Sequence, residues 1–269
     1  MTLAVEDRRT EDRSNPVGRA LHLVERNIRA YGQQRMVFLS SFIEPILYLF
    51  SVGIGVGALV GDVMTPGGQS VPYRSFVAPG LMAVAAMNGA IFDTTFNFFI
   101  KLKYAKSYDA ILATPMGVHD VAAGEVIWAL MRGALQAFAF LAVMAAVGLI
   151  ESPLAFLALP AALLIGMAFA GAGLAGATWI RSFVDFDYVA LAMIPLFLFS
   201  GVFFPLDRYP DAIATIIEFT PLYQGVELQR ALVLGELRPD LLFNVAYLAV
   251  MGVAGMRIAG KRLGRLLQP

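Results

Sequence analysis

The sequence predicts an all-α, polytopic membrane protein with six transmembrane helices. Apolar residues make up 58% of its 269 residues, charged residues only 15%, and the mean hydropathy is +0.70. A water-soluble domain carries about 25% charged residues. The charges are also confined to short stretches between long apolar runs. A lipid environment explains both observations, because apolar side chains can face acyl chains without cost.

Six apolar runs are long enough to cross a bilayer, which takes about 20 helical residues. They cover residues 36–59, 76–100, 121–149, 153–179, 186–205 and 240–259. Each should be helical, because lipid offers no hydrogen-bond partners to an open strand edge. We therefore expect a six-helix transmembrane domain over residues 36–260.

The flanking segments are polar or amphipathic. Residues 1–15 are mostly polar and lack the apolar core of a cleavable signal, so we expect a disordered cytoplasmic tail. Within 16–35, apolar residues recur at helical spacing from Leu21 to Tyr31, with arginines on the other faces. This pattern favours an amphipathic helix in the membrane interface, and a helix packed on protein is the alternative. Residues 261–269 should form a second cytoplasmic tail.

The distribution of Lys and Arg sets the orientation, because cytoplasmic loops carry an excess of positive charge. Placing the N-terminus inside puts most of the 20 Lys and Arg residues on the cytoplasmic side. Only Arg74, Arg208, Arg230 and Arg238 then fall outside. We therefore expect both termini in the cytoplasm.

The connection 101–120 is too long for a plain turn on the cytoplasmic side. Its residues Tyr108, Ile111 and Leu112 form an apolar stripe at helical spacing, and Thr114-Pro115 follows. The segment is short and amphipathic, which is typical of a helix that docks onto another surface.

The connection 205–239 lies on the outer side and is divided by prolines into two short segments. Thr220-Pro221 has the pattern of an N-cap followed by proline at the first helical position. Residues 213–219 are too apolar for a free extracellular loop. We expect broken half-helices that re-enter the outer face of the membrane, with protein covering their ends.

Four charged residues fall within the predicted spans, namely Glu44, Asp93, Glu125 and Arg132. A charge at membrane depth costs about 2.5–3.5 kcal/mol, so these side chains should face the bundle interior and pair. We expect Arg132 to bridge to Glu44 or Asp93, whereas Glu125 lies near the interface and can stay hydrated. A polar lining for a substrate path is the functional interpretation, and it is compatible with pairing.

Several other chemistries lack a signal. Cysteine is absent and the two histidines, His22 and His119, lie outside the apolar runs, which argues against metal or haem sites in the membrane. The pattern G-x-G-x-x-G at Gly171 lies within the fourth span with no preceding strand, so it indicates helix packing. No phosphate-binding loop and no dense basic block for nucleic acid is present. We expect no catalytic residues and no cofactor bound to this chain.

Several segments together resemble a known family. They are SSFIEPILYLFSVGIGVG at 40–57, SFVAPGLMAVAAMNGAIFDTTFNFF at 75–99, YDAILATPMGVHDVAAGEVIWA at 108–129, FLFSGVFFPLDRYP at 197–210 and TPLYQGVELQRALVLGE at 220–236. In order and spacing the chain resembles permease subunits of type 2 ABC exporters, especially the branch of nodulation-factor and daunorubicin exporters.

The resemblance implies a coupling helix within 104–118 that seats in a cytoplasmic ATP-binding cassette ATPase. Tyr108, Asp109, Ile111, Leu112, Thr114 and Pro115 would make that contact. It also implies a complex of two permeases, identical or paralogous, with two ATPases that bind the ATP. An amphipathic, lipid-like, glycosylated or drug-like substrate would leave the cytoplasm across the bacterial inner membrane.

Two other classes of function stay open on the residues alone. An ion- or proton-coupled transporter would use Glu44 and Asp93 as its carriers. A membrane-embedded lipid-modifying enzyme would need clustered carboxylates or histidines, whereas the acidic residues here lie singly on different spans.

Overall fold

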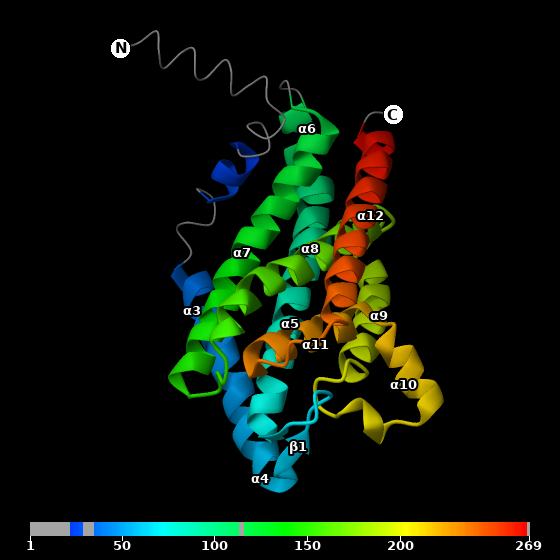
Figure 1. Ribbon diagram of the computed structural model, residues 1–269. Coiled ribbons are helices and arrows are strands. Elements are labelled where there is room, and N and C mark those ends of the chain that lie inside the picture. Colours follow the sequence, from blue (N-terminus) through cyan, green and yellow to red (C-terminus); the bar gives the residue numbers. More distant parts are fainter. Residues whose placement is uncertain (1–21, 29–34, 113–115, 268–269) are drawn as a thin grey trace.

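Five stretches of helix are long and apolar enough to cross a membrane, among the residues that this computed structural model describes (22–28, 35–112 and 116–267). They run over Phe42–Val60, Tyr73–Tyr104, Val118–Ala146, Pro153–Ala177 and Leu241–Leu266. The long helices stand side by side in an elongated bundle (Figure 1). The prediction of a helical, multi-pass chain is therefore confirmed, and five of the six predicted spans correspond to a helix of spanning length.

The first span changes its winding along its length. It combines α3 (Arg35–Tyr48), the π-helical η1 (Leu49–Val56) and α4 (Gly57–Val60). It ends at Gly61, whose φ of +73° is a left-handed backbone conformation that glycine adopts easily. A short antiparallel hairpin follows, made of β1 (Asp62–Met64) and β2 (Ser70–Pro72). The sequence did not predict this hairpin, because each strand is only three residues long.

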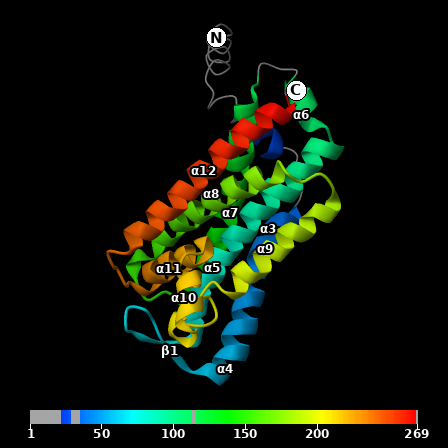
Figure 2. The same ribbon diagram turned by 90° about the vertical axis from the view of Figure 1, so that its right-hand side faces the viewer.

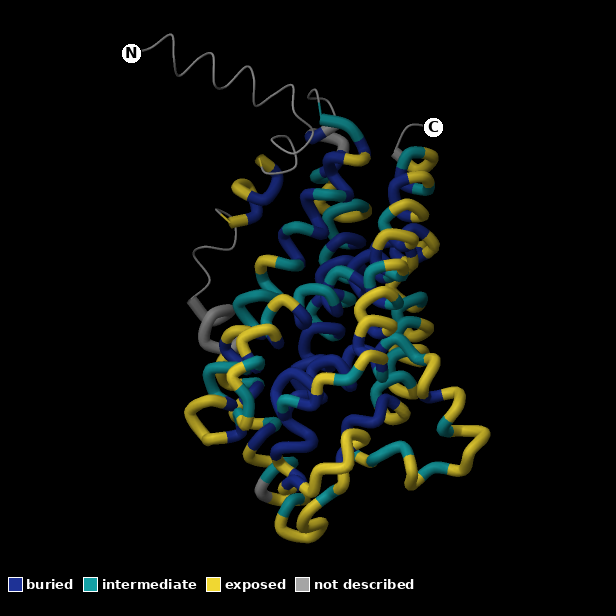
Figure 3. The backbone as a smooth tube through the Cα atoms, viewed as in Figure 1, coloured by how far each residue is buried: buried dark blue, intermediate teal, exposed yellow. Residues whose placement is uncertain are grey.

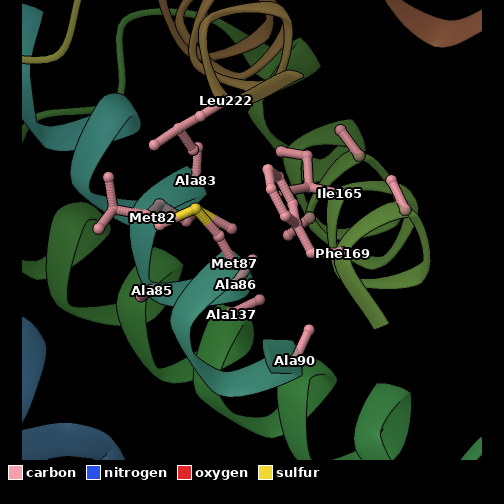
Figure 4. Packing of buried hydrophobic residues seen from close by; sticks show 14 of the residues in the cluster. Met82, Ala83, Ala85, Ala86, Met87, Ala90, Ala137, Ile165, Phe169 and Leu222 are labelled. Atoms are coloured by element: carbon pink, nitrogen blue, oxygen red, sulfur yellow. The ribbon is translucent and has the colours of Figure 1, made fainter. Parts of the chain in front are cut away.

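The second span occupies the centre of the molecule. It continues from α5 (Tyr73–Phe92) through the π-helical segments η2 (Asp93–Asn97) and η3 (Ile100–Tyr104) to the short α6 (Ser107–Leu112). Most side chains of α5 are buried. Its alanines and methionines pack against α7 at Ala137 and against α8 at Phe169 (Figure 4). Small residues let the backbones of neighbouring helices approach closely.

The third, fourth and last spans complete the bundle. They are α7 (Val118–Ala146), α8 (Ala158–Ala177) with the 3-10 turn η4 (Pro153–Leu157) before it, and α12 (Leu241–Leu267). A Cβ on Gly171 of α8 would lie 2.6 Å from the carbonyl oxygen of Gly252 on α12, so this crossing requires glycine. The glycine pattern therefore serves helix packing, as the sequence predicts. The helix α12 also continues to Leu267, through most of the segment expected to be a tail.

The predicted span 186–205 is shorter in the structure. After the 3-10 turn η5 (Phe183–Asp185), α9 (Phe186–Leu198) has only 13 residues and buries none of them. That length is about 20 Å, less than the roughly 30 Å of the hydrocarbon core. The helix carries Pro195 and ends where the chain turns at Gly201, which has φ +70°. Residues 199–205 are apolar because part of this turn packs on protein, with Val202 fully buried against α5.

The connection to α12 forms two short helices after η6 (Leu206–Arg208). They are α10 (Asp211–Glu218) and α11 (Pro221–Leu234). Thr220 caps α11 by accepting a hydrogen bond from the Tyr223 amide at 3.4 Å, with Pro221 at the first position, as the sequence predicts. Most of α11 is buried, whereas α10 exposes much of its apolar surface. Figure 3 shows this contrast between the buried interior and the exposed periphery.

The two ends of the molecule carry different elements. Both views place α6 and the C-terminal end of α12 at one end, and α4, the β1–β2 hairpin and α10 at the other (Figures 1 and 2). Of the expected interfacial helix, residues 22–28 are described, and they are helical. Leu23, Val24 and Asn27 are buried while Ile28 is exposed. One face of this segment therefore packs on protein.

Candidate functional site

The centre of the candidate site is an ion pair between Asp93 on η2 and Arg132 on α7. The Arg132 Nη1 lies 2.5 Å from the Asp93 Oδ1, and Asn97 Nδ2 donates to the same oxygen at 2.6 Å. Asp93 is almost completely buried, whereas about a third of the Arg132 side chain stays exposed. Of the two partners considered for Arg132, the structure therefore joins it to Asp93.

Glu44 has a different partner. Gln136, one turn beyond Arg132 on α7, donates its Nε2 hydrogen to Glu44 Oε2 at 2.7 Å. This hydrogen bond connects α3 to α7. Glu44 and Arg132 thus have different partners, and each is paired in a region where unpaired groups are costly.

These polar side chains line one side of a cleft of about 470 Å³. Glu44, Asn88, Arg132 and Gln136 contribute the polar groups, from α3, α5 and α7. The rest of the lining is mostly apolar and aromatic and comes from α5, η2 and α9, including Ile91, Phe96, Phe186, Val189 and Met193. The arrangement can hold a molecule that has both polar and apolar parts.

Glu125 lies apart from this cleft and differs from the expectation. It is buried, and its Oε2 accepts a hydrogen bond from Lys101 Nζ at 2.7 Å. Lys101 also donates to Asn27 Oδ1 at 3.5 Å, so the pair holds the helical segment 22–28 against the bundle. Glu125 is therefore not hydrated at the interface: its position near the end of α7 is covered by η3 and by that segment.

The predicted docking stripe also differs in its surroundings. Tyr108 is fully buried with its ring centroid 5.2 Å from that of Phe98, and Ile111 is buried in the same core. Two residues of the predicted stripe, Tyr108 and Ile111, therefore pack on this chain. The side chains of Asp109 and Leu112, and residues Thr114 and Pro115, lie outside the described part of the structure.

A second buried charge network surrounds Arg230 on α11, which the sequence placed in an external loop. Arg230 forms an ion pair with Glu227, donates to the carbonyl oxygens of Phe76 at 3.2 Å and Gly201 at 2.8 Å, and lies 3.8 Å from the centre of the Phe76 ring. Arg238 Nη2 contacts the other Glu227 oxygen at 2.9 Å. The sequence signal for this pair is the spacing of Glu227 and Arg230, three residues apart in an apolar stretch, because such residues are neighbours on a helix.

A third contact fixes the hairpin to the end of α11. Glu236 accepts hydrogen bonds from the Thr65 hydroxyl and, at 3.2 Å, from the Gly67 amide. Among the described residues, no group of three His, Asp or Glu side chains is placed to hold a metal ion. The charged clusters therefore connect segments of the fold, and the first of them borders a cleft.

The comparisons with known proteins agree with this architecture. The ABC-2 type transporter family matches residues 19–234, which contain the polar cleft and the Glu227–Arg230 pair. The chain belongs to this family. Nodulation protein J of Rhizobium leguminosarum bv. trifolii is 33% identical over 213 residues, 79% of either chain. Nodulation protein J of Rhizobium meliloti (strain 1021) is 28% identical over 232 residues, 86% of this chain and 87% of the relative.

A more distant relative supports the same placement. The inner membrane transport permease YadH of Escherichia coli (strain K12) is 24% identical over 200 residues, 71% of this chain and 70% of the relative. The resemblance to type 2 ABC permeases is therefore confirmed. This ABC-2 protein is a membrane component of a transport system.

Proposed function

We propose that this ABC-2 protein is the permease subunit of an ATP-driven exporter and that the cleft beside Arg132 lines its substrate path. The polar side chains of that cleft are the observation that carries the proposal. Charged groups inside a bilayer are costly and usually mark a pathway when they border a cavity. Here Glu44, Arg132 and Gln136 are paired, yet they still border an open hollow. Its mixed lining suits an amphipathic substrate such as a lipid-like, glycosylated or drug-like molecule.

A second permease would complete the path. One wall of the cleft is α9, which buries none of its residues and exposes Leu191 and Ile194. A second permease, identical or paralogous, would cover this side and enclose the substrate. In that assembly α9 would complete the set of six spans, as the fifth along the chain. The helices α10 and α11 would be the re-entrant half-helices near the outer surface.

The end that carries α6 would face the cytoplasm, in the inner membrane, with both termini on that side. Two ATPase subunits would bind ATP there and drive the permeases through α6. Because Tyr108 and Ile111 anchor α6 internally, the exposed residues Lys103, Tyr104 and Lys106 before it are the surface that supports an ATPase contact. Lys103 and Tyr104 belong to η3, so a push on this surface can be transmitted through η3 and η2 to α5.

The test is ATP-dependent transport by the permease and its ATPase in proteoliposomes, across a panel of lipids and drugs. Ala190 lines the cleft and is exposed on α9, so Ala190→Phe should block it and reduce transport at least tenfold, a loss of about 1.4 kcal/mol or more. Val250→Phe on the exposed face of α12 is the matched control and should leave transport unchanged. Transport that proceeds without ATP but requires a proton gradient would contradict the proposal.

A further inference from the structure

A second hollow lies beside the polar cleft, between α8, α9 and α12. Its volume is about 680 Å³, and most of its lining is apolar, including Phe169, Ala172, Leu196 and Met251. It adjoins the polar cleft, because Val189 borders both, but it contains none of the charged residues of the cleft. The groove is open, and α8 and α12 are of membrane-crossing length, so its opening faces acyl chains.

The length of the groove fits a single leaflet of a bilayer. Its lining extends along the chain from Asp185 to Leu196, eleven residues of helical backbone or about 16 Å. Half of a hydrocarbon core of about 30 Å is 15 Å. An acyl chain that enters at the Asp185 end therefore reaches the other end of the groove at the middle of the bilayer.

Aromatic and basic side chains gather at the mouth of the groove. Trp179 and Tyr188 line it and are largely exposed, which is typical of residues at the level of lipid headgroups. The guanidinium of Arg262 lies 3.8 Å from the centre of the Trp179 ring, and its Nε donates to Thr178 Oγ1 at 2.9 Å. Arg181 also lines the mouth and is exposed.

The positive charges at this mouth are available to an anion. Within the described part of the chain, neither Arg181 nor Arg262 forms an ion pair with a carboxylate. The one acidic residue in the lining, Asp185, accepts hydrogen bonds on its Oδ2 from the backbone amides of Arg181 at 2.7 Å and Ser182 at 3.1 Å. These hydrogen bonds, together with the nearby positive charge of Arg181, lower the pKa of Asp185.

We propose that this groove binds one anionic phospholipid from the leaflet at the α6 end. Its acyl chain lies along α9, between Gly176 and Met251, and its phosphate lies between Arg181 and Arg262. The basic last turns of α12, with Lys261 and Arg265, add to the positive field around the phosphate. This site is independent of the proposed transport, because it requires only that the helices lie in a bilayer.

Tryptophan quenching tests the site directly, because the chain has only two tryptophans. The Trp128→Phe variant keeps Trp179 as its single fluorophore, at the mouth of the groove. The Trp179→Phe variant keeps only Trp128, and its quenching gives the background. The protein is placed in vesicles of phosphatidylcholine that contain, at equal mole fraction, either phosphatidylglycerol or phosphatidylcholine with brominated acyl chains. We expect stronger quenching of Trp179 by the brominated phosphatidylglycerol. Equal quenching by the two lipids would overturn the proposal.

Two pairs of variants locate the lipid. Arg181→Gln should reduce the preference for phosphatidylglycerol about fivefold, the contribution of one basic residue near a membrane surface, whereas Arg265→Gln removes the same charge outside the groove and should have less effect. A Cβ on Gly176 or on Gly55 meets nothing within 4 Å, so both sites accept a larger residue. Gly176→Phe fills the groove and should abolish the preference, and Gly55→Phe should preserve it. A preference that survives both Arg181→Gln and Gly176→Phe would show that the lipid lies elsewhere.

Discussion

Arg230 is the residue whose replacement should destabilise this fold most. Its guanidinium is fully buried and joins three elements that are distant in sequence, through Glu227 on its own helix, the Phe76 carbonyl on α5 and the Gly201 carbonyl after α9. Replacing it with methionine keeps an unbranched side chain without the guanidinium, and leaves the carboxylate of Glu227 buried with only Arg238 as a charged partner.

The size of the effect follows from the loss of a buried partner. Removing one member of a buried ion pair costs about 3–5 kcal/mol, because the remaining charge is uncompensated. Removing both members costs much less, since no isolated charge stays behind. Arg230→Met should therefore be more destabilising than the double variant Glu227→Leu/Arg230→Met, in which Arg238 keeps its ion pair with Asp240 at 3.3 Å.

The assay is unfolding in mixed micelles with increasing sodium dodecyl sulfate, followed by tryptophan fluorescence. Arg208 is exposed and has no ion pair among the described residues, so Arg208→Met is the matched control and should change stability by less than about 0.5 kcal/mol. The reasoning is refuted if Arg230→Met is as stable as this control, or if the double variant is at least as unstable as Arg230→Met alone.

Three further predictions concern helix packing, the α6 anchor and the hairpin. Gly255→Leu places a side chain against the backbone of α8 and should prevent the protein from folding to a monodisperse peak on size-exclusion chromatography. Gly264→Leu meets open space and should leave the peak unchanged. Equal behaviour of the two variants would contradict the close α8–α12 crossing. Tyr108→Asp buries a charge and should reduce the yield of folded permease. Tyr104→Asp, on the exposed surface, should leave the yield intact but weaken co-purification with the ATPase. The reverse pattern would contradict the internal role of Tyr108. Glu236→Ala leaves the β1–β2 hairpin without its anchor and should raise its hydrogen–deuterium exchange, and unchanged exchange would show that this anchor does not hold the hairpin.

The sequence predicts the parts of this structure that depend on the solvent around each residue. Long apolar runs identify five spans because lipid requires continuous apolar helix. Local chemistry predicts the start of α11, where Thr220 and Pro221 satisfy the first amide groups of the helix. Charges at membrane depth predict that Asp93 and Arg132 need partners.

The remaining features depend on which surface covers a residue, and composition does not contain that information. Val202 is apolar because α5 covers it, so the run 186–205 looks like a full span although α9 ends at Leu198. The stripe of Tyr108 and Ile111 shows that α6 is amphipathic but not that its apolar face packs on its own chain. Arg230 looks like a loop charge until its neighbours are known.

The central claim is that the cleft beside Arg132 conducts a substrate under the control of an ATPase, and cysteine labelling tests it most directly. The chain has no cysteine, so Asn88→Cys places a single thiol in the cleft and Val250→Cys places one on the lipid-facing side of α12. In the complex with its ATPase, a membrane-impermeant maleimide should label Cys at position 88 at a rate that changes when ATP is added, and should not label position 250. A position 88 that stays unlabelled with and without ATP would contradict the account.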